Sequence, residues 1–438
     1  MMKDIINKEG TFWFKDDEEN KFKGTIVKKN NDFILKTKIF GKFNEEIEYG
    51  NIIIGKIEGT LITIYKCYLI SKHPELNFLV DYIFKNYNYE SGLTFKNIII
   101  KFNNLEEWIE NQTFEIKREK NDKLIKTKLT KKTFKQKESN INFLLGYEEK
   151  HNRISFSIRN NYSVQIEYPK QQKFESILSD IRIIEKFLTF AMYTPTNIKS
   201  IECNISDNAN RAKYVEIYSR FFNKNTEEIN IYDILIGFKD IQDKNDIFEK
   251  WFETCKNYKP LFDIYFTNFS TNYTLEYEFL SHTQALEAYM RKKEDFKDLY
   301  MDVKEYETIK IELNEYIKNS KMDDDHKQSW ESRIKFGNEV SLRKRLKDLI
   351  AYLNDYDTIN EIAGKKPNKF IEKVINNRNY YTHYDKNSDF EDDIPSLITL
   401  NFKLKLLIEL CILNELDFEK EFIENKLRIK HQRRPVAL

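Results

Sequence analysis

Two residues in the last quarter of the chain carry the side chains needed to cut a phosphodiester bond. Arg378 and His383 stand five residues apart in the run Arg-Asn-Tyr-Tyr-Thr-His. A guanidinium holds phosphate oxygens in a fixed fork and stabilises the added charge of the transition state. An imidazole moves protons near neutral pH. RNA supplies its own nucleophile, the 2′-hydroxyl, so this pair would need no metal ion. The alternative is a solvated arginine and a histidine that caps a helix.

The segment that carries the pair is predicted to be a helix. Lys365-Lys-Pro367 is a favourable start, and Phe370, Ile371, Val374 and Ile375 form an apolar stripe. Five helical residues turn through ~500°, so Arg378 and His383 would point ~140° apart. Either the helix ends or bends between them, which the run Asn379-Tyr-Tyr-Thr permits, or two copies of the motif meet in a homodimer. A dimer would supply one histidine as proton acceptor and one as donor.

Composition limits the class of protein. The chain has 438 residues, enough for two or three domains, and its 72 Lys+Arg nearly balance 71 Asp+Glu. The net charge of +1 gives no overall attraction to nucleic acid, so any basic surface must be local. The four cysteines are far apart in sequence, which indicates neither a zinc site nor a disulfide framework and favours the cytoplasm. A charged N-terminus and no apolar run of ~18 residues predict neither a signal peptide nor a membrane span. We expect no cofactor.

The first half of the chain is predicted to be β-rich. Apolar and polar residues alternate through most of 10–102 and again through Ile154–Arg159 and Tyr162–Tyr168, which we expect to be joined by a turn at Asn160-Asn161. One helix is predicted at Phe174–Met192, stopped by Thr194-Pro195. A polar stretch over 223–246 suggests a domain boundary near 240.

The second half is predicted to be an all-α bundle, because the apolar period changes to 3.6 residues. Helices are expected at Ile247–Tyr258, Tyr273–Lys293, Asp302–Asn319, Asp325–Asn354, Phe370–Tyr384 and Ser396–Arg428. The predicted fold class is therefore α+β and multidomain, with a β-rich domain over residues 1–240 followed by a helical bundle over 241–438.

Three residues are candidates for supporting roles around the motif. His282 shares a helical stripe with Phe279 and Leu286, so it faces the bundle core or an inner cleft; a satisfied core histidine is the alternative. Glu287 lies beside that stripe and would be either a surface residue or a support of the site. Tyr381 lies inside the motif itself.

A basic segment interrupts the β-rich half. Residues 117–137 hold ten Lys or Arg against Glu119 and Asp122, a local net charge of +8. Such a patch attracts a phosphate backbone, and we take Lys126, Lys128, Lys131 and Lys132 as candidates for RNA contact. The alternative is an edge hairpin whose lysines protect it from pairing with other chains.

With these residues in view, the chain resembles the ApeA-like proteins of bacterial antiphage defence. Gly10–Phe14, Lys66–Leu69 and Ile98–Trp108 resemble the N-terminal domain of that family. Gln284–Glu287 and the Arg378–His383 motif resemble its C-terminal HEPN domain. The family's motif is an arginine, commonly followed by Asn, Asp or His, with a histidine four to six residues further on, and this sequence matches it with Asn379 and a spacer of four.

The resemblance implies a metal-independent endoribonuclease that acts as a homodimer through its HEPN domain and leaves a 2′,3′-cyclic phosphate and a 5′-hydroxyl. It also implies abortive infection, in which cellular RNA, with transfer RNA as one candidate, is cut before a phage spreads. Arg378 and His383 would be catalytic, with Asn379 as polar support. Since a constitutively active toxin would be lethal, the N-terminal domain would sense a phage-derived trigger or restrain the nuclease.

Two other functions remain open at this stage. A HEPN domain that binds RNA or nucleotides without catalysis would use Arg378 and His383 for phosphate binding only. A metal-dependent nuclease is disfavoured, since the six histidines are scattered and no clustered Asp/Glu/His set stands out.

Overall fold

The computed structural model describes residues 4–38, 51–71, 75–89, 92–110, 113–119, 122–205, 214–222, 228–271, 273–384 and 393–432. The chain divides into an N-terminal unit, Met1–Phe252, and a C-terminal unit, Glu253–Leu438. The N-terminal unit extends beyond the predicted boundary at 240 because helix α4 (Ile247–Asn257) begins inside it. Phe248 packs on Phe187 with ring centroids 4.7 Å apart, and the Trp251 indole donates to the Ile183 carbonyl at 2.8 Å.

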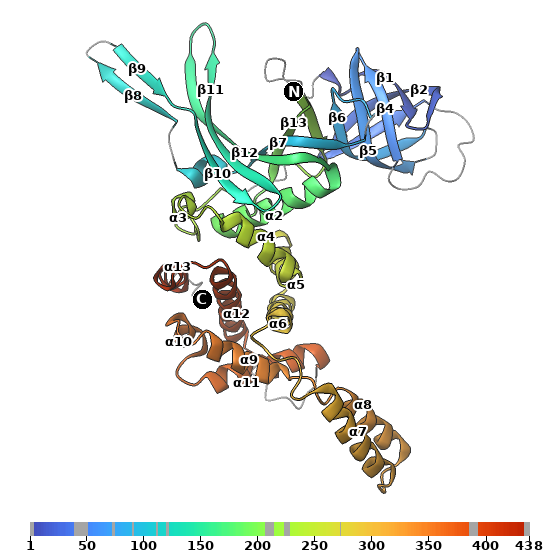
Figure 1. Cartoon of the computed structure of the whole chain (residues 1–438). Helices are drawn as coiled ribbons and strands as arrows, with labels where there is room; N and C mark the ends of the chain where they lie inside the picture. The colour runs from blue at the N-terminus through green and yellow to red at the C-terminus, as the bar shows by residue number, and fades with distance from the viewer. Residues whose placement is uncertain are drawn as a thin grey trace. The chain divides into compact units, whose positions relative to one another are not determined.

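A closed barrel forms the first part of the N-terminal unit (Figure 1). Its strands follow the order β6-β3-β2-β1-β4-β5, and β5 pairs again with β6. They are β1 (Glu9–Phe14), β2 (Asp17–Lys29), β3 (Asp32–Thr37), β4 (Asn51–Ile57), β5 (Thr60–Ser71) and β6 (Asn77–Lys85). Inward-facing residues such as Phe12, Leu35 and Phe78 fill the barrel. Gly55 must lack a side chain here, because a Cβ would meet the Phe12 ring at 2.2 Å.

Strand β6 also belongs to a larger antiparallel sheet, which continues β6-β14-β13-β7-β12-β11-β10. These strands are β7 (Thr94–Phe102), β10 (Thr130–Gln136), β11 (Ser139–His151), β12 (Phe156–Lys173), β13 (Ile198–Asn204) and β14 (Tyr214–Ser219). Strands β8 (Phe114–Glu119) and β9 (Asp122–Thr127) form a separate two-stranded sheet.

The expected turn at Asn160-Asn161 is wrong. Both residues lie inside β12, paired with Tyr147 and Gly146 of β11. Asn160 uses its side chain elsewhere, since its Oδ1 accepts from the Thr113 amide and hydroxyl at 3.3 and 2.9 Å. The turn falls instead at Asn152, whose Oδ1 accepts from the amides of Ile154 and Ser155. Thus a long ladder and a side-chain contact overrode the local turn signal.

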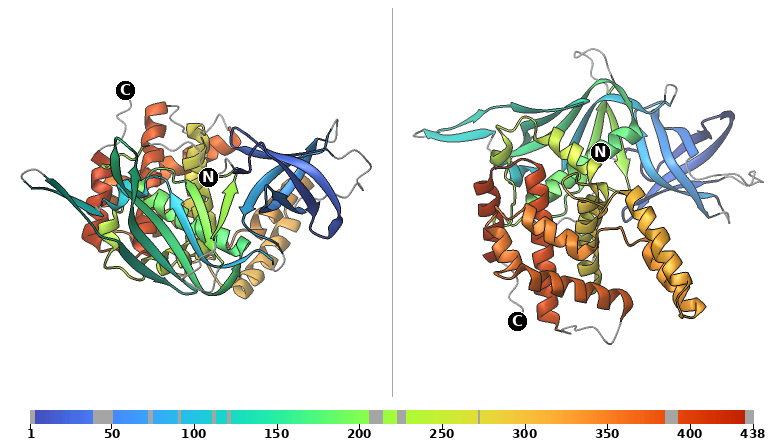
Figure 2. Two further views of the ribbon diagram at one scale, coloured as in Figure 1. Left: turned by 90° about the horizontal axis from the view of Figure 1, so that it is seen from above. Right: turned by 60° about the horizontal axis from the view of Figure 1, so that its bottom comes forward.

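Helices cover one face of this sheet (Figure 1; Figure 2). The helix α2 (Phe174–Met192) has the predicted bounds and ends at Tyr193 in the left-handed conformation, φ 58°. The short helices α1 (Leu105–Ile109) and α3 (Phe238–Ile241) add Trp108 and Phe238 to an aromatic core, with centroids 5.4 Å apart. The Trp108 indole donates to the Ile236 carbonyl at 2.7 Å, which fixes α1 in this core.

The C-terminal unit is helical. After α4 it contains α5 (Lys259–Ser270), α6 (Leu275–Lys292), α7 (Val303–Lys318), α8 (Asp324–Lys335), α9 (Leu342–Tyr352), α10 (Thr358–Ala363), α11 (Pro367–His383), α12 (Ile394–Glu415) and α13 (Lys420–Gln432). The predicted fold class, a β-rich region followed by an all-α bundle, is confirmed. Within this unit α7 and α8 form an antiparallel pair that extends away from the other helices (Figure 1).

Two predicted long helices are each broken in two. The expected helix at 325–354 stops at Phe336 because Asn338 is used to bind Met301, whose amide and carbonyl both contact its side chain at 3.0 Å. Ser341 then caps α9 by accepting from the Lys344 amide. The expected helix at 396–428 stops at Glu415, and Asp417 turns the chain with φ 55°. Helices α5 and α10 were not predicted. Across the described residues, no helix has the length and apolar character to cross a membrane.

Candidate active site

Helix α11 positions the motif. Pro367 stands in its first turn, and Phe370, Ile371 and Val374 are buried on the side that packs against α9 and α6. The helix runs unbroken through Arg378 to His383 and ends only at Tyr384, which adopts φ 51°. The Thr382 hydroxyl donates to the Arg378 carbonyl at 2.6 Å and so spans the turn between the two motif residues.

This continuity excludes one of the two predicted geometries. The helix does not end between Arg378 and His383, so that expectation is wrong: helical hydrogen bonding outweighs the low propensity of the Asn-Tyr-Tyr-Thr run. On one helix the two side chains point ~140° apart. His383 is exposed and Arg378 half-buried. The geometry that remains for convergence is a meeting of two copies.

Arg378 and Asn379 line an open cavity of about 450 Å³. The Arg378 guanidinium donates from Nη1 to Oδ1 of Asn379 at 3.3 Å. Asn379 therefore contacts the arginine of the motif, and its carbonyl holds one edge of the guanidinium. Arg343, from the first turn of α9, also lines the cavity and is exposed. With Arg291, three guanidiniums line this open cavity, and such groups can bind a phosphate.

Glu287, from α6, lines the same cavity. Its carboxylate accepts from Arg291 at 3.0 Å, and Arg291 in turn contacts Glu339 at 3.4 Å. This chain of ion pairs links α6 to the segment before α9. Glu287 and Arg378 thus line the same cavity, and the Glu287 carboxylate is already paired with Arg291.

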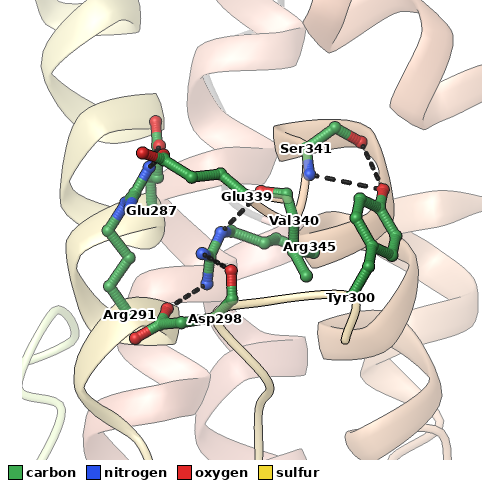
Figure 3. Close-up of polar contacts among 8 residues, drawn as sticks. All are labelled: Glu287, Arg291, Asp298, Tyr300, Glu339, Val340, Ser341 and Arg345. Atoms are coloured by element: carbon green, nitrogen blue, oxygen red, sulfur yellow. Dashed lines mark hydrogen bonds and ion pairs between the residues drawn. The ribbon is translucent and has the colours of Figure 1, made fainter. Parts of the chain in front are cut away.

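A buried arginine that the sequence analysis missed fixes this wall. Arg345 is 1 % exposed; its Nε donates to the Val340 carbonyl at 3.1 Å, and its Nη1 lies 2.8 Å from the Asp298 carboxylate. Figure 3 shows it flanked by the Glu287–Arg291–Glu339 pairs and by Tyr300, whose hydroxyl lies 3.4 Å from that of Ser341. Arg345 therefore joins the two ends of the α7–α8 pair beside the cavity. The available signal was an arginine within the apolar stripe of α9.

His282 lies in the core of the bundle, outside the lining of this cavity. It is fully buried, with Nδ1 2.5 Å from Oδ1 of Asn401 and Nε2 3.1 Å from Nδ2 of Asn268. The Asn401 oxygen can only accept from Nδ1, and the Asn268 amide nitrogen can only donate to Nε2. The ring is therefore neutral, with its proton on Nδ1. Both ring nitrogens are therefore engaged within the protein. Burial, together with the charge of Lys405, lowers the pKa of His282 to about 4.

Because of His282, we expect the free energy of unfolding to fall in mild acid. Because the folded pKa lies below the ordinary value of ~6.5, the unfolded chain binds the extra proton between those pH values. The neutral His282 ring stabilises the fold fully above pH ~6.5. As the pH falls to about 4, this contribution of about 3 kcal/mol to the free energy of unfolding is lost. Urea unfolding at pH 7 and 4.5 should show a smaller pH dependence for His282→Gln than for the wild type. His326→Gln, at an exposed histidine of α8, is the control. Equal pH dependence in His282→Gln and the wild type would contradict this account.

Tyr381 packs α11 against α6. Its ring centroid lies 6.1 Å from that of Phe279 and 5.3 Å from that of Tyr380. It is half-buried and contributes to the position of the motif through this packing.

The candidate lysines of the basic segment lie in the N-terminal unit. Lys126 is on β9, Lys128 follows it, and Lys131 and Lys132 are on β10, the last strand at one end of the large sheet. Lys131 lies 4.0 Å from Glu167, and Lys132 donates to Asn245 at 3.2 Å. Lys120 falls outside the described residues. Lysines on an edge strand fit the protective alternative as well as RNA contact.

Each of the two units matches a known family model. The model described as Apea-like HEPN matches residues 280–422, from within α6 to the start of α13, so the helical unit is a HEPN domain. The model described as ApeA N-terminal domain 1 matches residues 7–251, more than half of the chain. The chain therefore belongs to the ApeA family, as its sequence predicted. No curated protein and no solved structure matches it.

Proposed function

We propose that this protein is a metal-independent endoribonuclease of the HEPN type that cuts cellular RNA, transfer RNA among the candidates, during antiphage abortive infection in the cytoplasm. The observation that carries the proposal is the placement of the motif. Arg378, Asn379 and His383 occupy the last turns of α11 in a HEPN domain; the first two line an open cavity, and His383 is exposed.

In the proposed reaction, His383 takes the proton of a 2′-hydroxyl, and that oxygen attacks the adjacent phosphorus. The bond from phosphorus to the 5′-oxygen breaks. The protonated His383 of a second copy of the chain donates a proton to the leaving oxygen. The products are a 2′,3′-cyclic phosphate and a 5′-hydroxyl. Arg378 would hold the nonbridging oxygens and stabilise their added charge, while Asn379 keeps the guanidinium in place.

The homodimer is part of this proposal. The ~140° between Arg378 and His383 on an unbroken helix supports it, because two copies of the exposed end of α11 could bring two histidines to one phosphate. The N-terminal unit would then sense a phage-derived trigger or restrain the nuclease. Lys126, Lys128, Lys131 and Lys132 would guide RNA if the basic segment faces the substrate.

The same angle favours a second candidate, a non-catalytic HEPN scaffold. In a monomer Arg378 and His383 would each bind phosphate without cooperating in proton transfer. The two functions differ in product chemistry, since a scaffold creates no new 2′,3′-cyclic phosphate ends.

Phage plating tests the proposed role. Cells that carry the wild-type protein are expected to reduce plaque formation, and cells that carry Arg378→Ala/His383→Ala are expected to plate phage like cells without the gene. Equal protection by both would show that the motif is not needed for defence, and an immunoblot for equal protein levels is the control.

A further inference from the structure

A second cavity of the HEPN domain gathers positive charge. It has a volume of about 580 Å³ and lies between the segment after α10, the first half of α11 and the start of α12. Five lysines line it: Lys365, Lys366, Lys369, Lys373 and Lys403. Among the described residues of the lining, the one carboxylate is Asp393, which accepts from the Ser396 amide and caps α12. These described residues carry a formal excess of four positive charges, which favours the binding of an anion.

The floor of this lysine cavity is apolar. Phe370 and Leu400 are buried beneath the lysines, and the Lys403 ammonium lies 6.0 Å above the Phe370 ring. Over the described part of the chain, Lys365, Lys366 and Lys369 form no ion pair. These three ammonium groups therefore lie beside an apolar surface. This combination suits a ligand with several phosphates and a flat apolar group.

The lysine cavity and His383 share one face of α11. Fourteen helical residues separate Lys369 from His383, which places them ~40° apart around the axis and ~21 Å apart along it. Arg378, nine residues from Lys369, points to the opposite side by the same geometry. A ligand that starts at His383 and follows this face toward the start of α11 would reach the lysines.

An aromatic residue lies on this face between the two. Tyr380 is ~20° from both Lys369 and Lys373 around the helix axis. It is half-buried, and its ring contacts those of Tyr381 and Tyr384, with centroids 5.3 and 5.8 Å away. Lysines that track phosphates beside an aromatic ring that stacks on a base are the pattern used to bind single-stranded nucleic acid.

We propose that the lysine cavity and Tyr380 bind a single RNA strand that continues away from the bond cut at His383. The site is separate from the Arg378 cavity and holds phosphates that are not cleaved. It rests on the proposed function for the identity of its ligand. A free nucleotide would satisfy the cavity but would leave Tyr380 and the face leading to His383 unused.

The test is RNA binding by the full chain in a His383→Ala background, so that the RNA stays intact. Fluorescence anisotropy with a single-stranded oligoribonucleotide is measured over a series of salt concentrations. Lys369→Gln/Lys373→Gln is expected to weaken binding about 10-fold at low salt and to reduce the slope of log K against log salt by about 0.7 for each lysine. Tyr380→Ala is expected to weaken binding about 10-fold with an unchanged slope.

Lys318→Gln/Lys347→Gln is the matched control, because both lysines are exposed on this domain outside the cavity. A slope unchanged by the cavity substitutions would overturn the proposal. If adenosine monophosphate bound the cavity and only its affinity fell in Lys369→Gln/Lys373→Gln, the site would be one for free nucleotides, which also overturns it. Binding is measured without cleavage. If the wild type does not cut RNA, the proposed nuclease function is contradicted, but the binding data still test the lysine cavity independently.

Discussion

His383→Ala is expected to lower the rate of RNA cleavage by at least about 10⁴-fold. General acid and base catalysis each contribute about 10²–10⁴-fold, and in a homodimer the substitution removes both groups at once. His383 is exposed on the last turn of α11, so its loss leaves the helix and its buried stripe intact. Single-turnover cleavage of a labelled RNA measures the effect. His326→Ala, at another exposed histidine of the same domain, should cleave like the wild type.

Mixed dimers extend this prediction to the assembly. When differently tagged wild-type and His383→Ala chains are co-expressed and all dimers are purified together, activity should fall as the square of the wild-type fraction, because each site needs two histidines. A linear fall would show that each chain carries a complete site and would contradict the two-copy geometry drawn from the unbroken α11.

Arg378→Lys should lower kcat about 10²-fold although the charge is kept. A lysine ammonium cannot reproduce the planar fork that grips two phosphate oxygens, and loss of one preorganised donor to developing charge costs about 10²–10³-fold. The ammonium also loses the contact from Nη1 to Asn379. Steady-state kinetics should show a larger change in kcat than in KM.

The control for this substitution is Arg428→Lys on α13, an arginine of the same domain that contacts Asn425 and lies outside the cavity. Equal kcat values for Arg378→Lys and the wild type would mean that Arg378 supplies charge only, without the oriented contact assigned to it.

The periodicity of apolar residues predicted the elements that depend least on contacts with distant parts of the chain. Helix α2 has the expected bounds because its apolar stripe and its left-handed end at Tyr193 are local features. Closure of the barrel could not be predicted in this way, since it depends on the pairing of strands that are not consecutive, β1 with β4 and β3 with β6. The turn expected at Asn160-Asn161 failed for the same reason: its Thr113 contact is distant in sequence.

The motif was visible in the sequence, but its surroundings were not. Arg378, Asn379 and His383 follow from side-chain chemistry and spacing, whereas the cavity wall comes from α6 and from the segment that leads into α9. That segment was expected to lie inside one long helix. Its position depends on Arg345, which binds Val340 on its own side and Asp298 on the other side of the α7–α8 pair. Only the folded chain brings these groups together.

The most direct test of the central claim is to identify the ends left by the purified wild-type protein on RNA in excess EDTA, with His383→Ala alongside. We expect new 2′,3′-cyclic phosphate and 5′-hydroxyl ends from the wild type and none from the variant. New 3′-hydroxyl and 5′-phosphate ends, cleavage only when a divalent metal is restored, or equal cleavage by His383→Ala would each contradict it.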